Sequence, residues 1–336
     1  MRVRDFSGVS AVVKVFAASA AVCAAVWPAA VRAEDYPSRA VTVVVPFAAG
    51  GAFDSVARII TARMQEIMGQ PVIVENVGGA GGTTGVKRVI AAAPDGYTVL
   101  LGTVGTHAYN QTIYRHRRYD AVADFTPVTL FSEQSMVLLA RKTLPVDTFP
   151  EFVELLKTNG AKMQFGSAGV GSTTHLGCAL LNTHIGVTVA HVAYRGGGPA
   201  VNDLVGGQID YFCGNLGGYI GLIQGKQVKA VALLSKERSP LMPDLKTAHE
   251  QGMAELDVVS WTAFFLPKGA PKPVVDKLIE ATHAAMDTPE TRKRMLEIGV
   301  TGVSPERRSP EYLARFVVDE IARWEGPIKS AGLQVD

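Results

Sequence analysis

The sequence lacks an excess of basic residues and the usual metal-binding motifs, and each absence excludes a class of function. The 33 Lys and Arg are nearly balanced by 31 Asp and Glu, so there is no positive field of the kind that binds nucleic acid. The seven histidines form neither an H-E-x-x-H pair nor a cluster with cysteine, which leaves a metal site without support. We therefore expect no nucleic-acid partner and no metal.

Long apolar runs are also missing, except at the N-terminus. Basic residues precede an Ala- and Val-rich segment at 15–27, and small residues at 31–33 form a cleavable site. This pattern is typical of an export signal, so we expect cleavage near Ala33 and a mature protein in the periplasm. After the signal, 29 Lys and Arg face 30 Asp and Glu, and no apolar run reaches the ~20 residues that span a bilayer.

Cysteine is scarce as well, with only Cys178 and Cys213 after the expected signal. The periplasm permits a disulfide between them. Their spacing does not decide between a disulfide and two buried thiols, and the sequence leaves both open.

The length and the order of elements predict two α/β lobes. Roughly 300 residues follow the signal, more than one hydrophobic core usually holds. Strands alternate with helices, which predicts mostly parallel sheets with functional loops at the carboxyl ends of the strands. A strand at 137–140 carries the chain into a second series, and 261–266 takes it back. The predicted lobes are 34–134 with 258–336, and 135–257.

The stretch 41–54 is the first candidate site. Five β-favouring residues lead through Pro46 to Gly50-Gly51, and apolar residues recur beyond at helical spacing. Glycines at such a turn let a ligand approach the backbone, and the helix N-terminus offers an anion free N–H groups and a positive dipole end. Alternatively, this is an ordinary turn in which Asp54 complements the dipole or braces the loop. The stretch alone leaves both interpretations open.

Similar loops recur at 76–85, 102–107 and 167–173. Each follows a strand and presents glycines and short hydroxyl side chains without Arg or Lys, so each can offer backbone N–H groups to an anion. One such loop says little. Several, divided between two lobes, favour a cleft in which an acid is held from both sides.

Two other kinds of site, a dinucleotide site and a hydrolytic one, compete with this cleft as interpretations of the same loops. The glycines at 79–85 have the spacing G-x-G-x-x-x-G, and the next strand ends without an acid for a ribose, which disfavours a dinucleotide site. An α/β hydrolytic enzyme would use Ser167 or Ser172 with His175 or His191. No G-x-S-x-G elbow is present, and helix capping explains Ser172 equally well. We therefore expect no catalytic activity.

Several long motifs occur in one order along the whole chain after the signal. Together they resemble the solute receptors of tripartite tricarboxylate transporters, the Bug family. The motifs are Tyr36-Pro-Ser-Arg, Pro46-Phe-Ala-Ala-Gly-Gly-Ala-Phe-Asp-Ser-Val-Ala-Arg58, Val74-Glu-Asn, Gly79-Ala-Gly-Gly82, Pro94-Asp-Gly-Tyr97, Ser167-Ala-Gly-Val-Gly-Ser-Thr-Thr-His-Leu176, Tyr194-Arg-Gly-Gly-Gly-Pro-Ala200 and Leu204-Val-Gly-Gly-Gln-Ile-Asp210.

The resemblance implies a two-lobed receptor of the Venus-flytrap type, without a cofactor, that closes on a small mono- or dicarboxylate by a hinge motion. It also implies delivery to membrane permease subunits, and we expect a monomer. Arg195 stands where the family usually has Lys, and 77–78 lacks the family's Arg-Pro or Lys-Pro, so the identity of the acid stays open. The positions that match the family's ligand-binding loops are Ala49, Gly50, Gly51, Asp54, Ser167, Ala168, Gly171, Ser172 and Thr173, together with Thr103.

Overall fold

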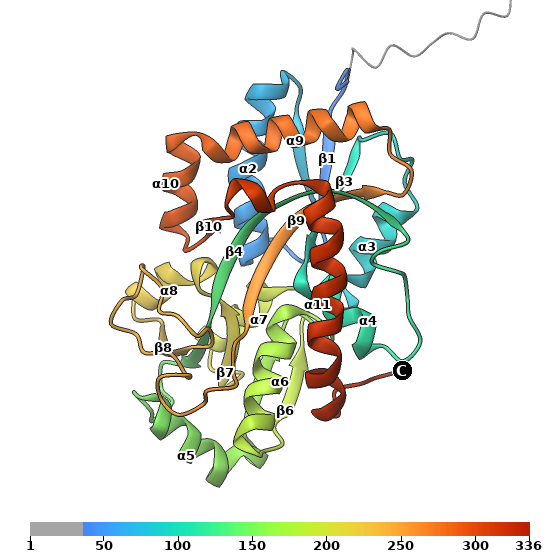
Figure 1. Ribbon diagram of the computed structural model, residues 1–336. Helices are drawn as coiled ribbons and strands as arrows, with labels where there is room; N and C mark the ends of the chain where they lie inside the picture. Colours follow the sequence, from blue (N-terminus) through green and yellow to red (C-terminus); the bar gives the residue numbers. More distant parts are fainter. Residues whose placement is uncertain (1–35) are drawn as a thin grey trace, which may run out of the picture. The chain divides into compact units, whose positions relative to one another are not determined.

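The computed structural model describes residues 36–336, and the predicted export signal lies outside them. Strands and helices alternate from the first strand onward, as the sequence predicts (Figure 1). None of the helices in this described part is both long and apolar enough to cross a membrane.

The first series contains three strands that pair in parallel. Its elements are β1 (Val41–Val45), α2 (Ala52–Met68), β2 (Val72–Asn76), a 3-10 turn (Ala80–Gly82), α3 (Thr83–Ile90), β3 (Thr98–Thr103), a π-helical turn (Gly105–Tyr109) and α4 (Asn110–Ile113). Buried, β-branched valines make β1 the central strand of the three. Helix α2 ends at Gly69, whose φ of 66° is the left-handed conformation that glycine favours at a helix end.

The second series repeats this arrangement. Its elements are α5 (Phe149–Asn159), a 3-10 turn (Gly160–Lys162), β5 (Gln164–Ser167), α6 (Thr173–Ile185), β6 (Ala190–Ala193), α7 (Gly197–Val205), β7 (Tyr211–Asn215), a 3-10 turn (Leu216–Gly218), α8 (Ile220–Gln224) and β8 (Val228–Leu233). Strand β5 pairs in parallel with β6 and β7. Ser172 caps α6, because its hydroxyl accepts the His175 N–H at 3.2 Å.

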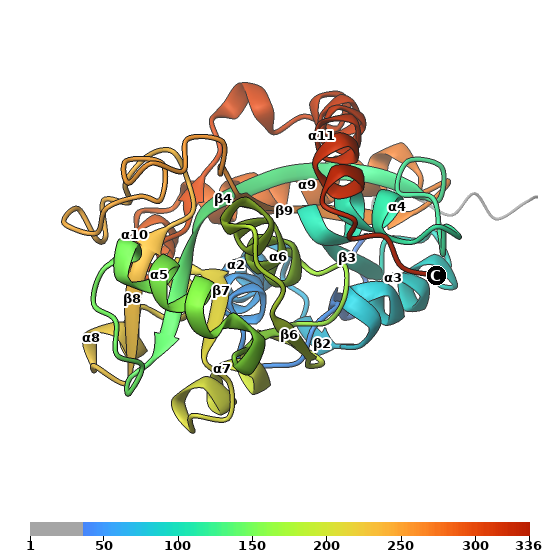
Figure 2. The ribbon, with the colours of Figure 1, turned by 90° about the horizontal axis from the view of Figure 1, so that it is seen from below.

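Two long strands connect the series. Strand β4 (Phe125–Arg141) has 17 residues, far more than the strand predicted at 137–140. It pairs with β9 (Val259–Pro267) as far as Ser135, and with β7 and β8 from Met136 and Val137 onward. Figure 2 shows β4 as one long curved strand that passes through both parts of the sheet. The strand is therefore shared by two lobes, and β9 brings the chain back.

The sheet has one continuous order, β2-β1-β3-β9-β4-β7-β5-β6, and β8 also pairs with β4. The strands that carry the candidate loops are parallel to their neighbours of the same series. Strands β4 and β9 run antiparallel to their partners, so the sheet is mixed at its centre. We call the part built on β1–β3 the first lobe and the part built on β5–β8 the second lobe. The boundaries at 134/135 and 257/258 stay a prediction.

The C-terminal segment covers the first lobe and the connecting strands. Its elements are α9 (Lys272–Asp287), α10 (Pro289–Glu297), β10 (Thr301–Gly302), a 3-10 turn (Pro305–Arg307) and α11 (Pro310–Ser330). Helix α9 packs on α2, and α11 packs along β4 (Figure 1). Glu320 of α11 is buried but paired, since its carboxylate accepts the indole N–H groups of Trp261 and Trp324 at 2.9 and 3.2 Å.

Cys178 of α6 and Cys213 of β7 form a disulfide in the second lobe, with their Cα atoms 5.3 Å apart. Both residues are fully buried. The structure thus decides a question that the sequence left open.

Candidate functional site

The loop between β1 and α2 is shaped by the first turn of α2. Gly50 has a φ of 79°, a left-handed conformation, and its N–H donates to Asp54 Oδ2 at 3.1 Å. Gly51 is the N-cap residue of α2, and no side chain caps the helix there. The first N–H groups of α2 have no acceptor within the helix, as at every helix start. They are available to a ligand beside the loop.

Asp54 braces this loop, which is one of the two roles that the sequence left open. Its carboxylate also accepts hydrogen bonds from Arg58 Nε at 3.1 Å and Asn76 Nδ2 at 3.0 Å. Burial opposes ionisation, but the hydrogen bonds from Arg58, Gly50 and Asn76 outweigh it and lower the pKa of Asp54 below its usual value. Asp54 is therefore ionised and already surrounded by donors.

We expect Asp54→Asn to lower the free energy of unfolding by about 1.5–3 kcal/mol, the usual value of hydrogen bonds to a charged group. The substitution replaces one carboxylate oxygen by an NH₂ group, which cannot accept the hydrogen bonds that these N–H groups donate. Urea unfolding at pH 7 measures the loss, with Glu66→Gln on the exposed side of α2 as the matched control. Equal stability of Asp54→Asn and wild type would contradict the bracing role.

The loop between β5 and α6 is held by its own hydroxyl groups. The Ser167 hydroxyl accepts the Gly169 N–H at 3.0 Å and lies 2.6 Å from His191 Nε2. The Ala168 N–H donates to Thr174 Oγ1 at 2.8 Å. These bonds fix the backbone of the loop without any charged side chain.

Ser167 and His191 are one of the pairs that the hydrolase alternative could use, but Ser167 is fully buried and its hydroxyl is engaged in holding the loop. The His191 ring lies 4.5 Å from the ring of His175. Burial lowers the pKa of His191 to about 4. Burial, with a smaller effect of His191, lowers the pKa of His175 to about 3. Both rings are thus neutral packing groups beneath the loop.

Acid should destabilise the protein through these histidines and His107, whose pKa burial lowers to about 3. All three have an ordinary value of 6.5 when unfolded, so the unfolded chain binds protons first as the pH falls. The stability is complete above pH 6.5 and is lost on acidification toward about pH 4. Urea unfolding at pH 7, 5.5 and 4.5 measures this slope, which His107→Phe should reduce. A flat profile over this range would contradict the prediction.

The N-terminus of α7 meets that of α2 across the two lobes. Helix α7 begins after Gly196, and no side chain caps it. A Cβ atom on Gly51 would lie 3.6 Å from the backbone nitrogens of both Gly197 and Gly198. Two positive helix ends therefore face each other at close range. An anion between them would satisfy free N–H groups of both helices.

A small cavity of about 20 Å³ lies at this meeting point. A water molecule needs about 10–15 Å³ of such volume, so the cavity between the touching lobes is smaller than an organic acid. Three of the predicted site residues, Gly51, Asp54 and Ala168, line it. The other lining residues are Phe47, Ala48, Ala52, Phe53, Thr174, Gly197, Asn215 and Tyr219.

The lobes touch directly around the cavity. The Ala48 N–H of the first lobe donates to the Arg195 carbonyl of the second at 3.0 Å. The Tyr114 hydroxyl lies 3.2 Å from the Ala80 carbonyl of its own lobe and 3.1 Å from the Val170 carbonyl of the other. The structure is thus a fully closed arrangement. An acid has to enter when the lobes are apart, and the lobes then close on it less completely than they do here, because the cavity is smaller than the acid.

Four of the remaining predicted residues do not line the cavity. Ala49 and Gly50 are exposed. Thr103 is fully buried, and both its N–H and its hydroxyl are bonded to Thr106. The hydroxyl of Thr173 is buried and has no hydrogen-bond partner among residues 36–336. Thr103 is therefore placed in the interior of the first lobe.

Gly171 and Ser172 lie at the interface of the lobes. A Cβ atom on Gly171 would be 1.9 Å from Asn110 Oδ1 of the first lobe, so only glycine fits there. Ser172 is 1% exposed, and its hydroxyl caps α6. These two residues shape the second lobe's loop.

Sequence reasoning missed the contribution of α7 and β7. Gly197, Asn215 and Tyr219 line the cavity but were absent from the predicted site. The run 196–199 was a usable signal, because it is a further glycine-rich loop that follows a strand and opens a helix. Asn215 and Tyr219 carried no comparable pattern.

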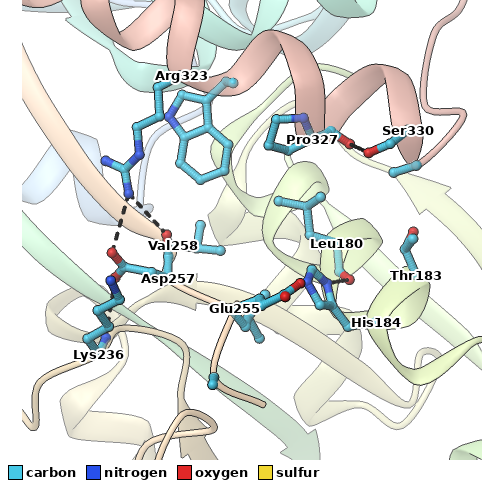
Figure 3. A pocket seen from close by; sticks show the side chains of 14 residues that line it. Leu180, Thr183, His184, Lys236, Glu255, Asp257, Val258, Arg323, Pro327 and Ser330 are labelled. Atoms are coloured by element: carbon cyan, nitrogen blue, oxygen red, sulfur yellow. Dashed lines mark hydrogen bonds and ion pairs between the residues drawn. The ribbon is translucent and has the colours of Figure 1, made fainter.

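A separate pocket of about 510 Å³ is lined by α6, the segment before β9 and α11 (Figure 3). Several of its polar side chains already form hydrogen bonds or ion pairs with other groups of the protein. Arg323 Nη2 lies 3.3 Å from Asp257 Oδ2, and His184 Nδ1 lies 2.8 Å from the Leu180 carbonyl. None of the predicted site residues is among those that line it.

Comparison with known proteins decides the family. The model of the tripartite tricarboxylate transporter family receptor matches residues 56–333. The chain belongs to this family. A UPF0065 protein of Agrobacterium vitis, from the TAR-I ttuE-ttuC' intergenic region, is 36% identical over 310 residues, covering 92% of this chain and 89% of the relative.

Solved structures agree with this membership and with the two-lobed fold of periplasmic binding proteins. The periplasmic binding protein BugD is 37% identical, with a TM-score of 0.86 over 89% of this chain and 99% of that one. MatC of Rhodopseudomonas palustris with bound malate is 41% identical, with a TM-score of 0.85 over 87% of this chain and all of that one. These relatives of the receptor are solute-binding proteins, and the hydrolase alternative finds no support among them.

Proposed function

We propose that this chain is a periplasmic receptor that captures a small mono- or dicarboxylate between its lobes and delivers it to the permease subunits of a tripartite tricarboxylate-type transporter. The single observation that carries the proposal is the meeting of two uncapped helix N-termini, one from each lobe, at the cavity. The malate bound to MatC is a carboxylate of the expected size. The receptor itself would perform no chemistry.

Capture would work by a shift between open and closed populations. The N–H groups of α2 belong to one lobe and those of α7 to the other, so an acid contacts both sets only when the lobes are closed. Ligand contacts that are complete only in one state stabilise that state. The closed surface would then be the form that the permease recognises.

Fixed backbone dipoles would supply the selectivity for anions. Among the described residues 36–336, those that line the cavity include no Arg, Lys or His. Helix N-termini stabilise a negative charge by about 0.3–1 kcal/mol each in exposed settings and more when partly buried. Such a site binds a carboxylate group firmly but is little affected by the pH of the periplasm.

A thermal-shift screen against a panel of organic acids, followed by calorimetry, tests the proposal. An acid at 100 times its dissociation constant should stabilise the protein by about 2.7 kcal/mol. The amide of the same acid is the matched control, because it keeps the shape but not the charge. Absence of any shift across mono- and dicarboxylates would contradict carboxylate capture.

Further parts of the proposal are export with cleavage near Ala33, a hinge between 134 and 135 and between 257 and 258, and a monomeric state. The pairing of β4 supports the hinge, because its partner changes from β9 to β7 at Ser135–Met136. N-terminal sequencing of the periplasmic protein and light scattering test the other two.

A further inference from the structure

Asn215 is a buried polar residue at the cavity whose side-chain oxygen has no partner. It is the last residue of β7, it is 2% exposed, and it lines the cavity together with Gly51 and Gly197. Within residues 36–336, Asn215 Oδ1 accepts no hydrogen bond. An unpaired buried acceptor costs about 1–3 kcal/mol, and most buried side-chain polar atoms find a partner. The protein therefore carries a polar group that a bound molecule can satisfy.

Asn182 and Asn76 are used differently, whereas Asn110 Oδ1, which lies away from the cavity lining, also has no partner within residues 36–336. Asn182 Oδ1, in the same lobe, accepts the Tyr211 hydroxyl at 2.7 Å. Asn76 Nδ2, beside the loop between β1 and α2, donates to the Phe47 carbonyl and to Asp54 Oδ1 at 3.1 and 3.0 Å. These amides hold the protein together. Asn215 instead stands at the carboxyl end of a strand, where ligands bind in parallel sheets.

The charges around the cavity limit what Asn215 can recognise. In the part of the chain that the structure describes, Asp54 is the only charged residue that lines the cavity, and its carboxylate accepts hydrogen bonds from Arg58, Gly50 and Asn76. A ligand ammonium would thus find no free carboxylate in this lining. A hydroxyl group both donates and accepts, so it suits the amide of Asn215 in either orientation of its oxygen and nitrogen.

We propose that Asn215 is a specificity-determining residue that binds a hydroxyl group of the captured acid, so that the receptor prefers a hydroxy acid to the same acid without the hydroxyl. This inference rests on the proposed function. The carboxylate lies between the starts of α2 and α7, and the hydroxyl-bearing carbon faces the end of β7. The preference arises because an acid without the hydroxyl leaves the buried amide unpaired.

Calorimetry with two matched pairs, lactate against propionate and malate against succinate, tests the inference. Wild type should bind the hydroxy acid of at least one pair about tenfold more tightly. Asn215→Leu should bring that ratio to about one, mainly by weakening the hydroxy acid. Tyr211→Phe, which breaks the bond to Asn182 elsewhere in the lobe, should leave the ratio unchanged. Asn215→Ala gives the same comparison if the leucine variant does not fold.

The possible outcomes separate this inference from the proposed function. Equal binding within the pairs, a ratio that survives Asn215→Leu, or binding only of acids without a hydroxyl overturns the inference and leaves carboxylate capture standing. Failure of every acid in the wider panel to bind wild type overturns both. Loss of all binding in Asn215→Leu, with succinate weakened as much as malate, assigns Asn215 to the carboxylate and also overturns the inference.

Discussion

Gly198→Val is expected to reduce carboxylate affinity by about 100-fold or more while the protein stays folded. Gly198 lies in the first turn of α7 and does not have a left-handed φ. Because Pro199 follows it, a side chain at 198 adds some local strain whether the lobes are open or closed, so urea unfolding of the variant is measured beside its affinity. A Cβ atom on Gly198 would stand 2.7 Å from the Ala49 carbonyl of the other lobe, closer than real contacts permit. The clash exists only when the lobes are closed. The variant therefore loses the contacts of one lobe, and a loss of about 2.7 kcal/mol corresponds to 100-fold.

Gly221→Val is the matched control for this prediction. Gly221 lies in α8 of the same lobe, and a Cβ atom there would meet no atom within 4 Å. It should bind ligand as wild type does. Calorimetry measures affinity, and small-angle scattering with and without ligand measures closure, which Gly198→Val should not show. Wild-type affinity in Gly198→Val would mean that α7 does not form one side of the cleft.

The structure also changes which glycine is the informative one. From the sequence, Gly50 is the first glycine to substitute, because a glycine at this turn lets a ligand approach the backbone. In the structure a Cβ atom on Gly50 meets nothing within 4 Å, although its φ of 79° would strain any other residue. A Gly50 variant would thus mix loop strain with ligand blocking. Gly198 does not have a left-handed φ, so a side chain there acts on ligand binding and lobe closure without the strain that the left-handed φ would add at Gly50.

The fold was largely predictable because its elements follow local patterns. Apolar residues at helical spacing predict α2, and the β-favouring run 41–45 predicts β1. The length of β4 was missed because its middle holds Ser132 to Ser135, polar residues that do not read as a strand. They are in a strand because β9 pairs with them over their whole length. Tertiary pairing there overrides local propensity.

The sequence predicts the parts of the candidate site that backbone groups form. It does not predict the parts that depend on hydrogen bonds between residues distant in the sequence. The pair Gly50-Gly51 predicts a helix N-terminus that is open to an anion, and in the structure Gly51 lines the cavity. The roles of Asp54 and Ser167 as loop braces depend on partners such as Asn76 and His191, which are distant in sequence. No pattern in the sequence pairs Asn215 with a loop more than 160 residues before it.

Family membership was predictable from the order of the motifs, and the geometry explains why those motifs are glycine-rich. A Cβ atom on Gly81 would lie 1.9 Å from the Val170 carbonyl of the other lobe, and one on Gly78 would lie 2.4 Å from the Arg195 carbonyl. These glycines let two backbones touch when the lobes close. Several of the loops that the sequence offers for ligand binding are therefore also closing surfaces.

Removal of the disulfide by Cys178→Ala with Cys213→Ala is expected to lower the free energy of unfolding by about 2–4 kcal/mol. The bond joins α6 to β7 across 35 residues of sequence, and a loop of that size restricts the unfolded chain by roughly this amount. The two truncated side chains also leave buried space. Ligand affinity should change little, because neither cysteine lines the cavity.

A reducing agent distinguishes the stability that the disulfide contributes from the stability that the packing of the two cysteine side chains contributes. Urea unfolding of wild type with a reducing agent should lose most of the stability that the double variant loses, since the thiols still fill the core but no longer join the chain. The double variant should not respond to reductant. Wild type that is indifferent to reductant, with a stability equal to that of the double variant, would show that α6 and β7 are held by packing alone and that the two cysteines stay reduced.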